Sequence, residues 1–471
     1  SRDRVRAAIK NCGYKYPSGH ITVNLAPADV KKEGPVYDLP IAVGLLRATG
    51  KVMNESLDEY AFAGELALSG NVRRVKGILP MTLEMKRIGR RVMVVPYENA
   101  EEASVVEGID VIPVRTLQET VQFLNGTRVI EPCRTDLGFL VRGAANSGED
   151  FSDIKGQFAA RRAIEVAVAG GHNILMVGSP GSGKTMLARR IPSILPSLTV
   201  EEALEISRIH SVAGHEKCRG GFVTRRPFRS PHHTVSSIGL LGGGARPVPG
   251  EVSLAHRGVL FLDEFAEFPR NALEVLRQPL EDGHVGVSRA AAAHDFPSRF
   301  MLVAAMNPCP CGYYSDPERS CRCSQSAVMK YQSRVSGPLI DRIDIQIEVP
   351  PVKVEALPSM EKGEPSAAIR ERVEAARAVQ AARYRGECGI YTNADAKGAD
   401  LPEICKLSTC DCEKLVRMIG RLGLSARAYD KILRVARTCA DLDGVEIVRE
   451  EHLSAALQMR HLDREQNSCW I

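Results

Sequence analysis

The feature that most constrains this 471-residue sequence is a glycine-rich octapeptide between an apolar run and a helical pattern. The octapeptide fits G-x-x-x-x-G-K-[ST] at every fixed position and consists of Gly178, Ser179, Pro180, Gly181, Ser182, Gly183, Lys184 and Thr185. Residues 173–177 before it predict a buried strand, and residues 186–191 after it predict a helix. Glycines allow backbone N–H groups to surround a phosphate at a helix N-terminus. A glycine-rich turn without a ligand is disfavoured because motif and context occur together.

Two further apolar runs end in polar side chains. Val259–Leu262 is followed by Asp263 and Glu264, and Phe300–Met306 is followed by Asn307. Because the carboxyl ends of parallel strands meet at one edge of a sheet, we expect these groups beside the glycine-rich loop.

The chemistry expected at this edge is that of a Mg²⁺–ATP site. Lys184 would reach the β and γ phosphates, and the Thr185 hydroxyl and Asp263 would bind Mg²⁺. Glu264 would orient and deprotonate water, and Asn307 would sense the γ phosphate. On local grounds Asp263–Glu264 could instead start a turn, and Asn307 could be a turn residue before Pro308.

Periodicity divides the chain into four segments. We expect an α/β domain over residues 1–126, a linker over 127–150, a second α/β domain over 151–350 and a helical domain over 351–471. In the first domain the pattern predicts strands at 21–25, 92–95 and 111–113, and helices at 38–49, 98–107 and 116–124. In the last domain it predicts helices at 367–385, 412–422, 427–441 and 450–459.

Composition excludes several classes of protein. The formal net charge of +5, from 62 basic and 57 acidic residues, is too small to indicate nucleic-acid binding by itself. No apolar run approaches the roughly 18 residues of a membrane-spanning helix, so no membrane association is expected. Thirteen scattered cysteines without a secretion signal favour a cytoplasmic location. The chain starts without Met inside a helical pattern, and we expect a fragment that lacks its first strands.

Three flanking motifs carry a family resemblance. They are Arg226–His233 (RPFRSPHH), the stretch from Gly242–Gly244 to Pro249–His256 (PGEVSLAH), and Leu339–Asp344 (LIDRID). With the phosphate-binding loop, they resemble the magnesium-chelatase-like branch of AAA+ ATPases, and the whole chain resembles the ComM/YifB type. This resemblance implies a bacterial hexameric ring with DNA helicase or branch-migration activity in natural transformation and recombination. The alternatives are a metal-insertion ATPase subunit, an ATP-dependent protease and a non-enzymatic scaffold.

The same resemblance assigns two arginines to ATP hydrolysis. It implies that Arg342 is an arginine finger reaching the ATP of a neighbouring subunit, and that Arg427 is a second sensor on the helical lid. A fixed guanidinium neutralises the charge that develops during phosphoryl transfer. Without the resemblance, either arginine could be a solvated or salt-bridged surface residue.

The first domain resembles the Lon protease domain, through Lys32–Asp38, Ala63–Gly70 and Gly77–Pro80. In active Lon proteases a serine follows the Gly-Pro pair, where this chain has Val36. The partner lysine position is occupied by Leu79. Neither side chain can attack a peptide or accept a proton, so we expect a catalytically degenerate domain used for assembly or DNA engagement. A relocated pair of Ser69 and Lys76, which lie nearby but out of register, is the alternative.

Two basic segments are candidate DNA contacts. An insertion between His215 and Pro249 carries six basic residues and one acid, together with Phe222 and Phe228. We expect a flexible basic loop whose sparse aromatic side chains are available to nucleic acid. A predicted hairpin, residues 284–289 and 294–299, has Arg289 near its tip. Basic loops suit electrostatic contact with a phosphate backbone, although they can also join subunits. The candidate residues are Arg225, Arg226, Arg229 and Arg289.

Two C-x-C pairs separated by nine residues follow Asn307. They consist of Cys309, Cys311, Cys321 and Cys323. Four thiolates can enclose a tetrahedral Zn²⁺, and a short polar loop gains stability from such a cross-link. Free reduced thiols, or metal capture only in the purified protein, are the alternatives. Cys410 and Cys412 form another C-x-C pair with no partner pair nearby, and we interpret it as incidental.

Overall fold

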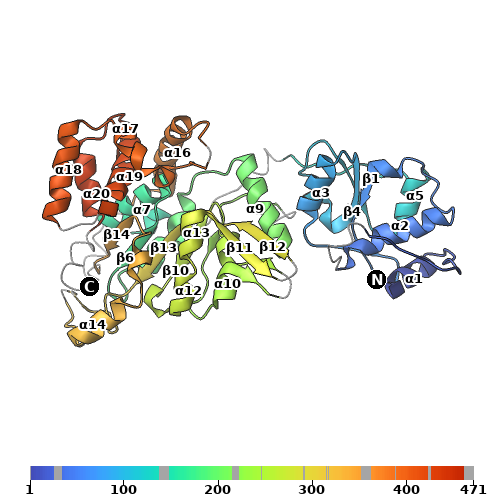
Figure 1. Ribbon diagram of the computed structural model, residues 1–471, viewed down its shortest axis with the longest axis horizontal. Coiled ribbons are helices and arrows are strands. Elements are labelled where there is room, and N and C mark those ends of the chain that lie inside the picture. Colours follow the sequence, from blue (N-terminus) through green and yellow to red (C-terminus); the bar gives the residue numbers. More distant parts are fainter. Residues whose placement is uncertain are drawn as a thin grey trace. The chain divides into compact units, whose positions relative to one another are not determined.

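The computed structural model describes residues 2–25, 34–136, 148–214, 222–244, 247–289, 292–314, 316, 318–351, 362–387, 389–422 and 426–460. It divides into two compact units (Figure 1). Unit 1 comprises Ser1–Ala144 and Leu198–Arg225, and unit 2 comprises Ala145–Ser197 and Arg226–Ile471. This division differs from the expected boundaries in two respects. Residues 198–225 join the first unit, and the C-terminal helices share a unit with the second α/β segment.

Unit 1 contains a parallel three-stranded sheet with strand order β1-β4-β5 (Tyr60–Phe62, Val92–Pro96 and Asp110–Val114). Side chains alternate between its two faces, since Met93 and Val95 enter one apolar cluster and Val94 enters the other. A two-stranded antiparallel pair, β2 (Glu65–Leu66) and β3 (Val72–Arg73), completes the strands. The helices are α1 (Arg2–Asn11), α2 (Asp38–Ala48), α3 (Ile78–Arg87), α4 (Ala100–Ala103) and α5 (Leu117–Leu124).

Most elements expected in unit 1 are confirmed. α2, α5, β4 and β5 agree with the prediction to within a few residues, and the Thr116 hydroxyl caps α5 by accepting from Glu119 N at 3.0 Å. The strand expected at 21–25 is wrong, because these residues pair with no described strand and leave Ile21, Val23 and Leu25 exposed. The helix expected at 98–107 is reduced to α4 after a 3₁₀ turn at Tyr97–Asn99. The Asn99 side chain bonds to both Val75 N and Val75 O, which fixes this turn.

Helix α9 (Val200–Ala213) belongs to unit 1 although it lies between segments of unit 2 in sequence. It begins with a capping box formed by Thr199 and Glu202 and packs on α3. Phe222 and Val223, which come after it beyond an undescribed stretch, are buried in the same apolar cluster as α3. Residues 222 and 223 of the insertion are therefore part of a folded core.

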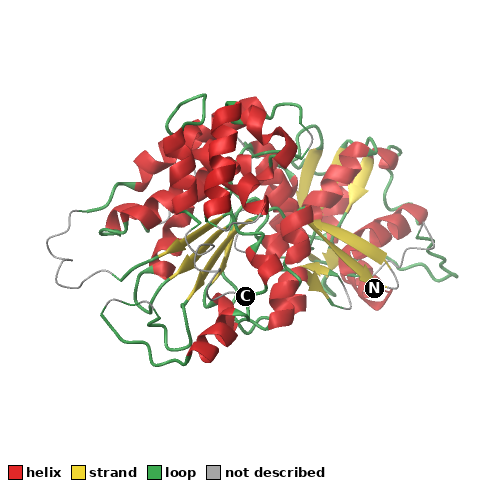
Figure 2. Ribbon diagram, turned by 60° about the vertical axis from the view of Figure 1, so that its left-hand side comes forward, coloured by secondary structure: helices red, strands yellow, loops and turns green. Residues whose placement is uncertain are grey.

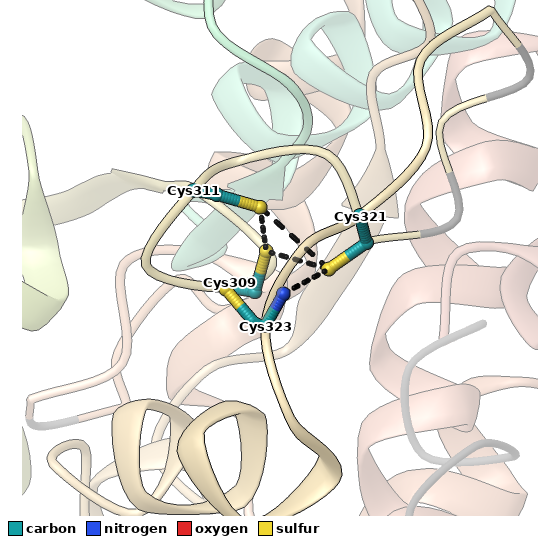
Figure 3. Close-up of side chains that lie close together, drawn as sticks. All are labelled: Cys309, Cys311, Cys321 and Cys323. Atoms are coloured by element: carbon teal, nitrogen blue, oxygen red, sulfur yellow. Dashed lines mark hydrogen bonds between the residues drawn. The ribbon is translucent and has the colours of Figure 1, made fainter.

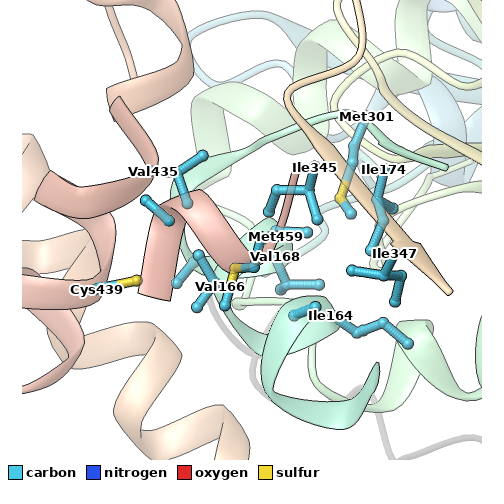
Figure 4. Packing of buried hydrophobic residues seen from close by; sticks show 14 of the residues in the cluster. Ile164, Val166, Val168, Ile174, Met301, Ile345, Ile347, Val435, Cys439 and Met459 are labelled. Carbon is cyan, nitrogen blue, oxygen red and sulfur yellow. The ribbon is translucent and has the colours of Figure 1, made fainter. Parts of the chain in front are cut away.

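Unit 2 is built on a five-stranded parallel sheet with the order β14-β6-β13-β10-β7. The strands are Ile345–Glu348, Ile174–Val177, Met301–Met306, Val259–Leu262 and Phe228–Arg229. Apolar side chains of β6 alternate between two clusters, which agrees with helices on both faces of the sheet (Figure 2). Ile174, Ile345 and Ile347 pack with Ile164 of α7 and Val435 of α19 on one face (Figure 4). The predicted parallel α/β core is confirmed.

The remaining elements of unit 2 include helices that cover the sheet and a C-terminal helical segment. The expected C-terminal helices are observed as α16, α18, α19 and α20, with a short α17 between the first two. None of the helices in the described residues is both long and apolar enough to cross a membrane. The helices are α7 (Phe158–Gly170), α8 (Lys184–Arg190), α10 (Ser237–Leu241), α11 (Glu251–Leu254), α12 (Arg270–Glu274), α13 (Arg277–Asp282), α14 (Gln325–Gln332), α15 (Gly337–Ile340), α16 (Ser366–Arg383), α17 (Leu401–Ile404), α18 (Thr409–Arg421), α19 (Ala426–Leu442) and α20 (Glu450–Gln458).

Two short antiparallel pairs complete unit 2. β8 (Gly242–Gly243) pairs with β9 (Val248–Pro249), and β11 (His284–Arg289) pairs with β12 (Ala292–Pro297). The hairpin expected from the sequence before the Asn307 strand is thus confirmed, with its second strand starting two residues earlier than predicted.

Candidate nucleotide-binding site

Three adjacent parallel strands, β6, β13 and β10, end at one edge of the sheet of unit 2. The residues that directly follow them are Gly178, Asn307 and Asp263. The expectation that the residues after these apolar runs meet at one edge of the sheet, beside the glycine-rich loop, agrees with the structure.

The glycine-rich loop connects β6 to α8, and its glycines are required by its shape. Gly181 and Gly183 have φ angles of 82° and 94°, a region that side chains with a Cβ rarely adopt. A Cβ on Gly178 would lie 2.3 Å from Val349 O. The loop thus passes close to the neighbouring backbone and leads directly into the N-terminus of α8.

Lys184, the first residue of α8, folds its side chain back over the loop. Its Nζ donates to Gly178 O at 2.7 Å and Ser179 O at 3.0 Å, and lies 3.3 Å from Asn307 Oδ1. Burial lowers the pKa of Lys184 to about 8, and the nearby Asp263 carboxylate opposes this shift. The buried Lys184 ammonium is thus held above the glycine-rich loop, where it can bind anionic oxygens. The Asn307 side chain lies beside it, as the sequence predicted.

Thr185 and Asp263 meet directly. The Thr185 hydroxyl donates to Asp263 Oδ2 at 2.7 Å, and Glu264 N donates to Asp263 Oδ1 at 2.9 Å. A hydroxyl and a carboxylate oxygen at this separation are hard ligands of the kind that Mg²⁺ prefers.

Glu264 turns the chain sharply after β10. Its φ of 52° is unusual for a residue with a side chain and redirects the carboxylate. Glu264 Oε2 lies 2.8 Å from His233 Nδ1, and the His233 ring is 4.0 Å from that of His232, centroid to centroid. Sequence reasoning missed His233 as a site residue. Its place in the RPFRSPHH motif gave the signal, but only the fold brings it to Glu264.

Arg342 and Arg427 lie at the opposite edge of the sheet. Asn173, which directly precedes β6, donates through Nδ2 to Arg342 O at 2.9 Å, so Arg342 is at the amino end of that strand. The Arg342 guanidinium bonds to Glu281 at 2.6 Å, and that of Arg427 bonds to Asp341 at 2.7 Å. β6 alone separates the two edges by about 13 Å, at ~3.3 Å per residue. The structure does not bring these arginines to the glycine-rich loop of the same chain.

The candidate DNA residues differ in their surroundings. Arg229 forms a two-bond pair with Glu251 at 2.6 and 2.7 Å, and Arg226 donates to the backbone oxygens of Pro196, Ser197 and Arg257. These two guanidinium groups serve internal contacts, contrary to the expectation that they are available to DNA. Arg225 is exposed, and Arg289 ends β11.

The two expected aromatic residues of the insertion are also used internally. Phe222 is buried in unit 1, and the Phe228 ring stacks on that of Phe261 at 5.9 Å. The expected flexible loop with available aromatics is therefore wrong for residues 222–229, while residues 215–221 and 245–246 lie outside the described part of the chain.

The four cysteines predicted to bind zinc converge (Figure 3). The Sγ atoms of Cys309, Cys311 and Cys321 lie 3.4–3.7 Å apart, and all four Sγ atoms lie within 4.8 Å of one another. A tetrahedral ZnS₄ site with Zn–S bonds of about 2.3 Å has sulfur–sulfur separations of about 3.8 Å. The backbone N–H groups of Arg322 and Tyr313 lower the pKa of Cys311 to about 6. The donor set fits a thiolate-bound metal ion.

The positions expected for a Lon-type catalytic pair are apolar in structure as well as in sequence. Leu79 lies in α3 and is fully buried, and Val36 packs against the same apolar cluster. Neither group offers a nucleophile or a base.

Comparison with known proteins supports the assignment of the whole chain. Residues 150–357 match the family described as magnesium chelatase, subunit ChlI, residues 1–99 match subunit ChlI of Mg-chelatase, and residues 363–460 match its C-terminal region. The chain is 44% identical to YifB of Escherichia coli over 98% of its length and 89% of that protein. It is also 44% identical to the competence protein ComM of Haemophilus influenzae, over 98% of its length and 90% of that protein.

This chain belongs to the magnesium-chelatase-like family of AAA+ ATPases. A weaker similarity links it to Lon protease 2 of Bacillus subtilis, at 28% identity over 26% of the chain and 22% of that protein. The strand order, the glycine-rich loop and the paired acids fit an AAA+ ATPase, and the donors at the loop suit a triphosphate with Mg²⁺.

Proposed function

We propose that the chain is an ATP-driven DNA motor that assembles as a homo-oligomeric, hexameric ring and acts as a helicase or in branch migration. Natural transformation and homologous recombination are the processes that use such an activity, and the similarity to a protein named for competence supports the first. A cytoplasmic location is part of the proposal, because thiols that bind a metal ion must stay reduced and the cytoplasm keeps them so.

ATP hydrolysis follows from the groups at the carboxyl edge of the sheet. Mg²⁺, held by Thr185 and Asp263, would neutralise phosphate charge. Backbone N–H groups of the glycine-rich loop, such as those of Gly181 and Gly183, and the Lys184 ammonium would bind and orient phosphate oxygens. Glu264 accepts the proton of the attacking water, and Asn307 positions that water.

The observation that carries the oligomeric part of this proposal is the position of Arg342. Arg342 and Arg427 bond to acids at the amino edge of the sheet, far from the Lys184 of their own chain. The partner carboxylates, Glu281 and Asp341, both remain partly accessible to solvent, so each arginine can exchange its carboxylate for phosphate. A neighbouring copy is the molecule that would bring ATP to this edge, so the hydrolytic site is complete only between two copies.

DNA would contact the exposed Arg225 and the hairpin β11–β12, whose first strand ends at Arg289. Arg226 and Arg229 are left out because their guanidinium groups have internal partners. Contacts of this kind would be mainly electrostatic and would weaken with salt.

The decisive experiment measures ATP hydrolysis by the purified protein with and without forked DNA, together with DNA binding. Stimulation of hydrolysis and displacement of a strand are expected. Hydrolysis without any response to single-stranded, duplex or forked DNA would contradict the DNA part and favour a metal-insertion motor. Cleavage of casein would favour a protease.

A further inference from the structure

The cysteine cluster lies against the glycine-rich loop. Gly312, between Cys311 and Cys321 in sequence, is buried, and a Cβ placed on it would be 2.5 Å from Pro180 Cδ and 2.6 Å from Pro180 Cγ. Pro180 is the third residue of the glycine-rich loop. The cysteine segment therefore packs on the loop at Pro180 without room for a methyl group.

Both ends of the cysteine segment are fixed to the core of unit 2. On one side it follows Asn307, whose Oδ1 is 3.3 Å from Lys184 Nζ, and Pro308 O accepts from Gln332 Nε2 at 3.2 Å. On the other side it leads into α14, which Ser324 caps. Between these ends, Cys309 and Gly312 are the buried members of the described residues. Neither of these two residues has a large apolar side chain, so their burial alone contributes little to the stability of the segment.

A local turn presents Gly312 to Pro180. Gly312 N donates to Cys309 O at 3.0 Å, and Gly312 has a φ of 84°. Cys309 and Cys311 lie at this turn, and their sulfur atoms face that of Cys321. A bond from each sulfur to one metal ion would fix the turn, and with it the surface that meets Pro180.

We infer that a zinc ion bound by Cys309, Cys311, Cys321 and Cys323 holds Gly312 against Pro180 and so keeps the glycine-rich loop in its nucleotide-binding shape. Loss of the ion frees the segment, and the loop loses its outer support. The cluster then makes nucleotide affinity depend on zinc. This inference rests on nucleotide binding at the loop and is independent of DNA.

The test uses the full chain in reducing buffer, with zinc content measured by mass spectrometry and affinity measured with a fluorescent ATP analogue and Mg²⁺. Cys321→Ser with Cys323→Ser is expected to lose zinc and to bind the analogue at least about tenfold more weakly. The matched control is Cys410→Ser with Cys412→Ser, a C-x-C pair outside the cluster. Removal of zinc from the parent by a chelator, and its restoration, should lower and restore affinity, which separates the effect from misfolding.

A second pair of variants tests the contact itself. Gly312→Ala is expected to keep zinc and still lose about tenfold in affinity, because its methyl group displaces Pro180. Gly386→Ala is the control, since Gly386 has a similar φ of 91° and open space around it. Parent-like affinity in zinc-free protein or in Gly312→Ala would overturn the inference, as would a parent that binds no zinc. A parent that binds zinc but no nucleotide would instead contradict the proposed ATP site.

Discussion

The two units of this chain both contain a parallel sheet, but they differ in the side chains at the positions where catalytic groups would be expected. Each has a parallel sheet buried on both faces by apolar side chains. In unit 2, Lys184, Asp263 and Asn307 stand at the carboxyl edge, whereas in unit 1 the positions of a catalytic pair are occupied by Val36 and Leu79. The scaffold alone does not decide activity, which depends on a few side chains at one edge.

The difference is also energetic. Burial of Lys184 lowers its pKa to about 8, which means that the charged form of this side chain is less stable in the folded protein than in water. Leu79 is fully buried in an apolar cluster and stabilises its unit. In unit 2 the burial of the Lys184 ammonium therefore costs stability, which the binding of an anionic ligand can offset. In unit 1, Val36 and Leu79 contribute only apolar packing at the positions of the catalytic pair.

Replacement of Arg342 by Ala should have the largest effect on the active unit. If Arg342 is the arginine finger that we propose, ATP hydrolysis should fall about 10³-fold, because a guanidinium that neutralises developing charge is lost. The measurement is steady-state phosphate release, and Arg385→Ala, at an exposed arginine, is the control.

An experiment that mixes two inactive variants tests whether Arg342 acts on the ATP of a neighbouring copy. Arg342→Ala and Lys184→Ala subunits should both be inactive alone and should regain part of the activity together, because one type supplies the arginine and the other an intact loop. No recovery in mixed oligomers would argue against a site shared between copies.

In unit 1, Leu79→Ala should reduce the free energy of unfolding by about 3 kcal/mol, as expected for a cavity in a packed core. Urea denaturation of the parent and variant measures this change. Leu68→Ala is the control because Leu68 is 58% exposed. A gain of peptidase activity by Val36→Ser with Leu79→Lys would break the contrast between the units.

Glu264→Gln should lower hydrolysis about 100-fold while nucleotide binding is retained, since the amide cannot accept the proton of water. Single-turnover hydrolysis and analogue binding measure the two effects separately. Glu267→Gln, with the same change of charge three residues away, should leave the rate near that of the parent. An unchanged rate in Glu264→Gln would exclude this carboxylate as the base.

His233→Ala should have the smallest effect, a several-fold loss in kcat worth on the order of 1 kcal/mol, because the Glu264 carboxylate loses a partner at 2.8 Å. KM should change little, and His233→Asn should restore part of the rate. His232→Ala is the neighbouring control. Equal losses in both alanine variants would indicate a structural role for the motif rather than positioning of Glu264.

Sequence patterns predicted the parts of the site that depend on local order. Apolar runs followed by Asp263 and Asn307 indicated the sheet edge, and the C-x-C spacing indicated the thiol cluster. Both predictions depend on short-range rules: buried strands are runs of apolar residues, and turns bring residues that are close in sequence together.

Long-range contacts could not be predicted in this way. His233 reaches Glu264, Arg229 binds Glu251 and Arg342 binds Glu281 only because the sheet order brings distant segments together. The basic insertion was expected to be available to DNA because its charges are evident in the sequence, whereas its partners are not. The same limit explains why α9 was not assigned to unit 1.

The assignment of α9 to unit 1 has a practical consequence for the design of fragments that express one unit alone. The chain passes between the two units at residues 144–145, 197–198 and 225–226, so no single cut separates them. A fragment ending at the first crossing would leave the α3 surface without α9, Phe222 and Val223, and an uncovered apolar surface of this kind promotes aggregation. A usable expression fragment of unit 1 would need residues 198–225 grafted back through a designed connection.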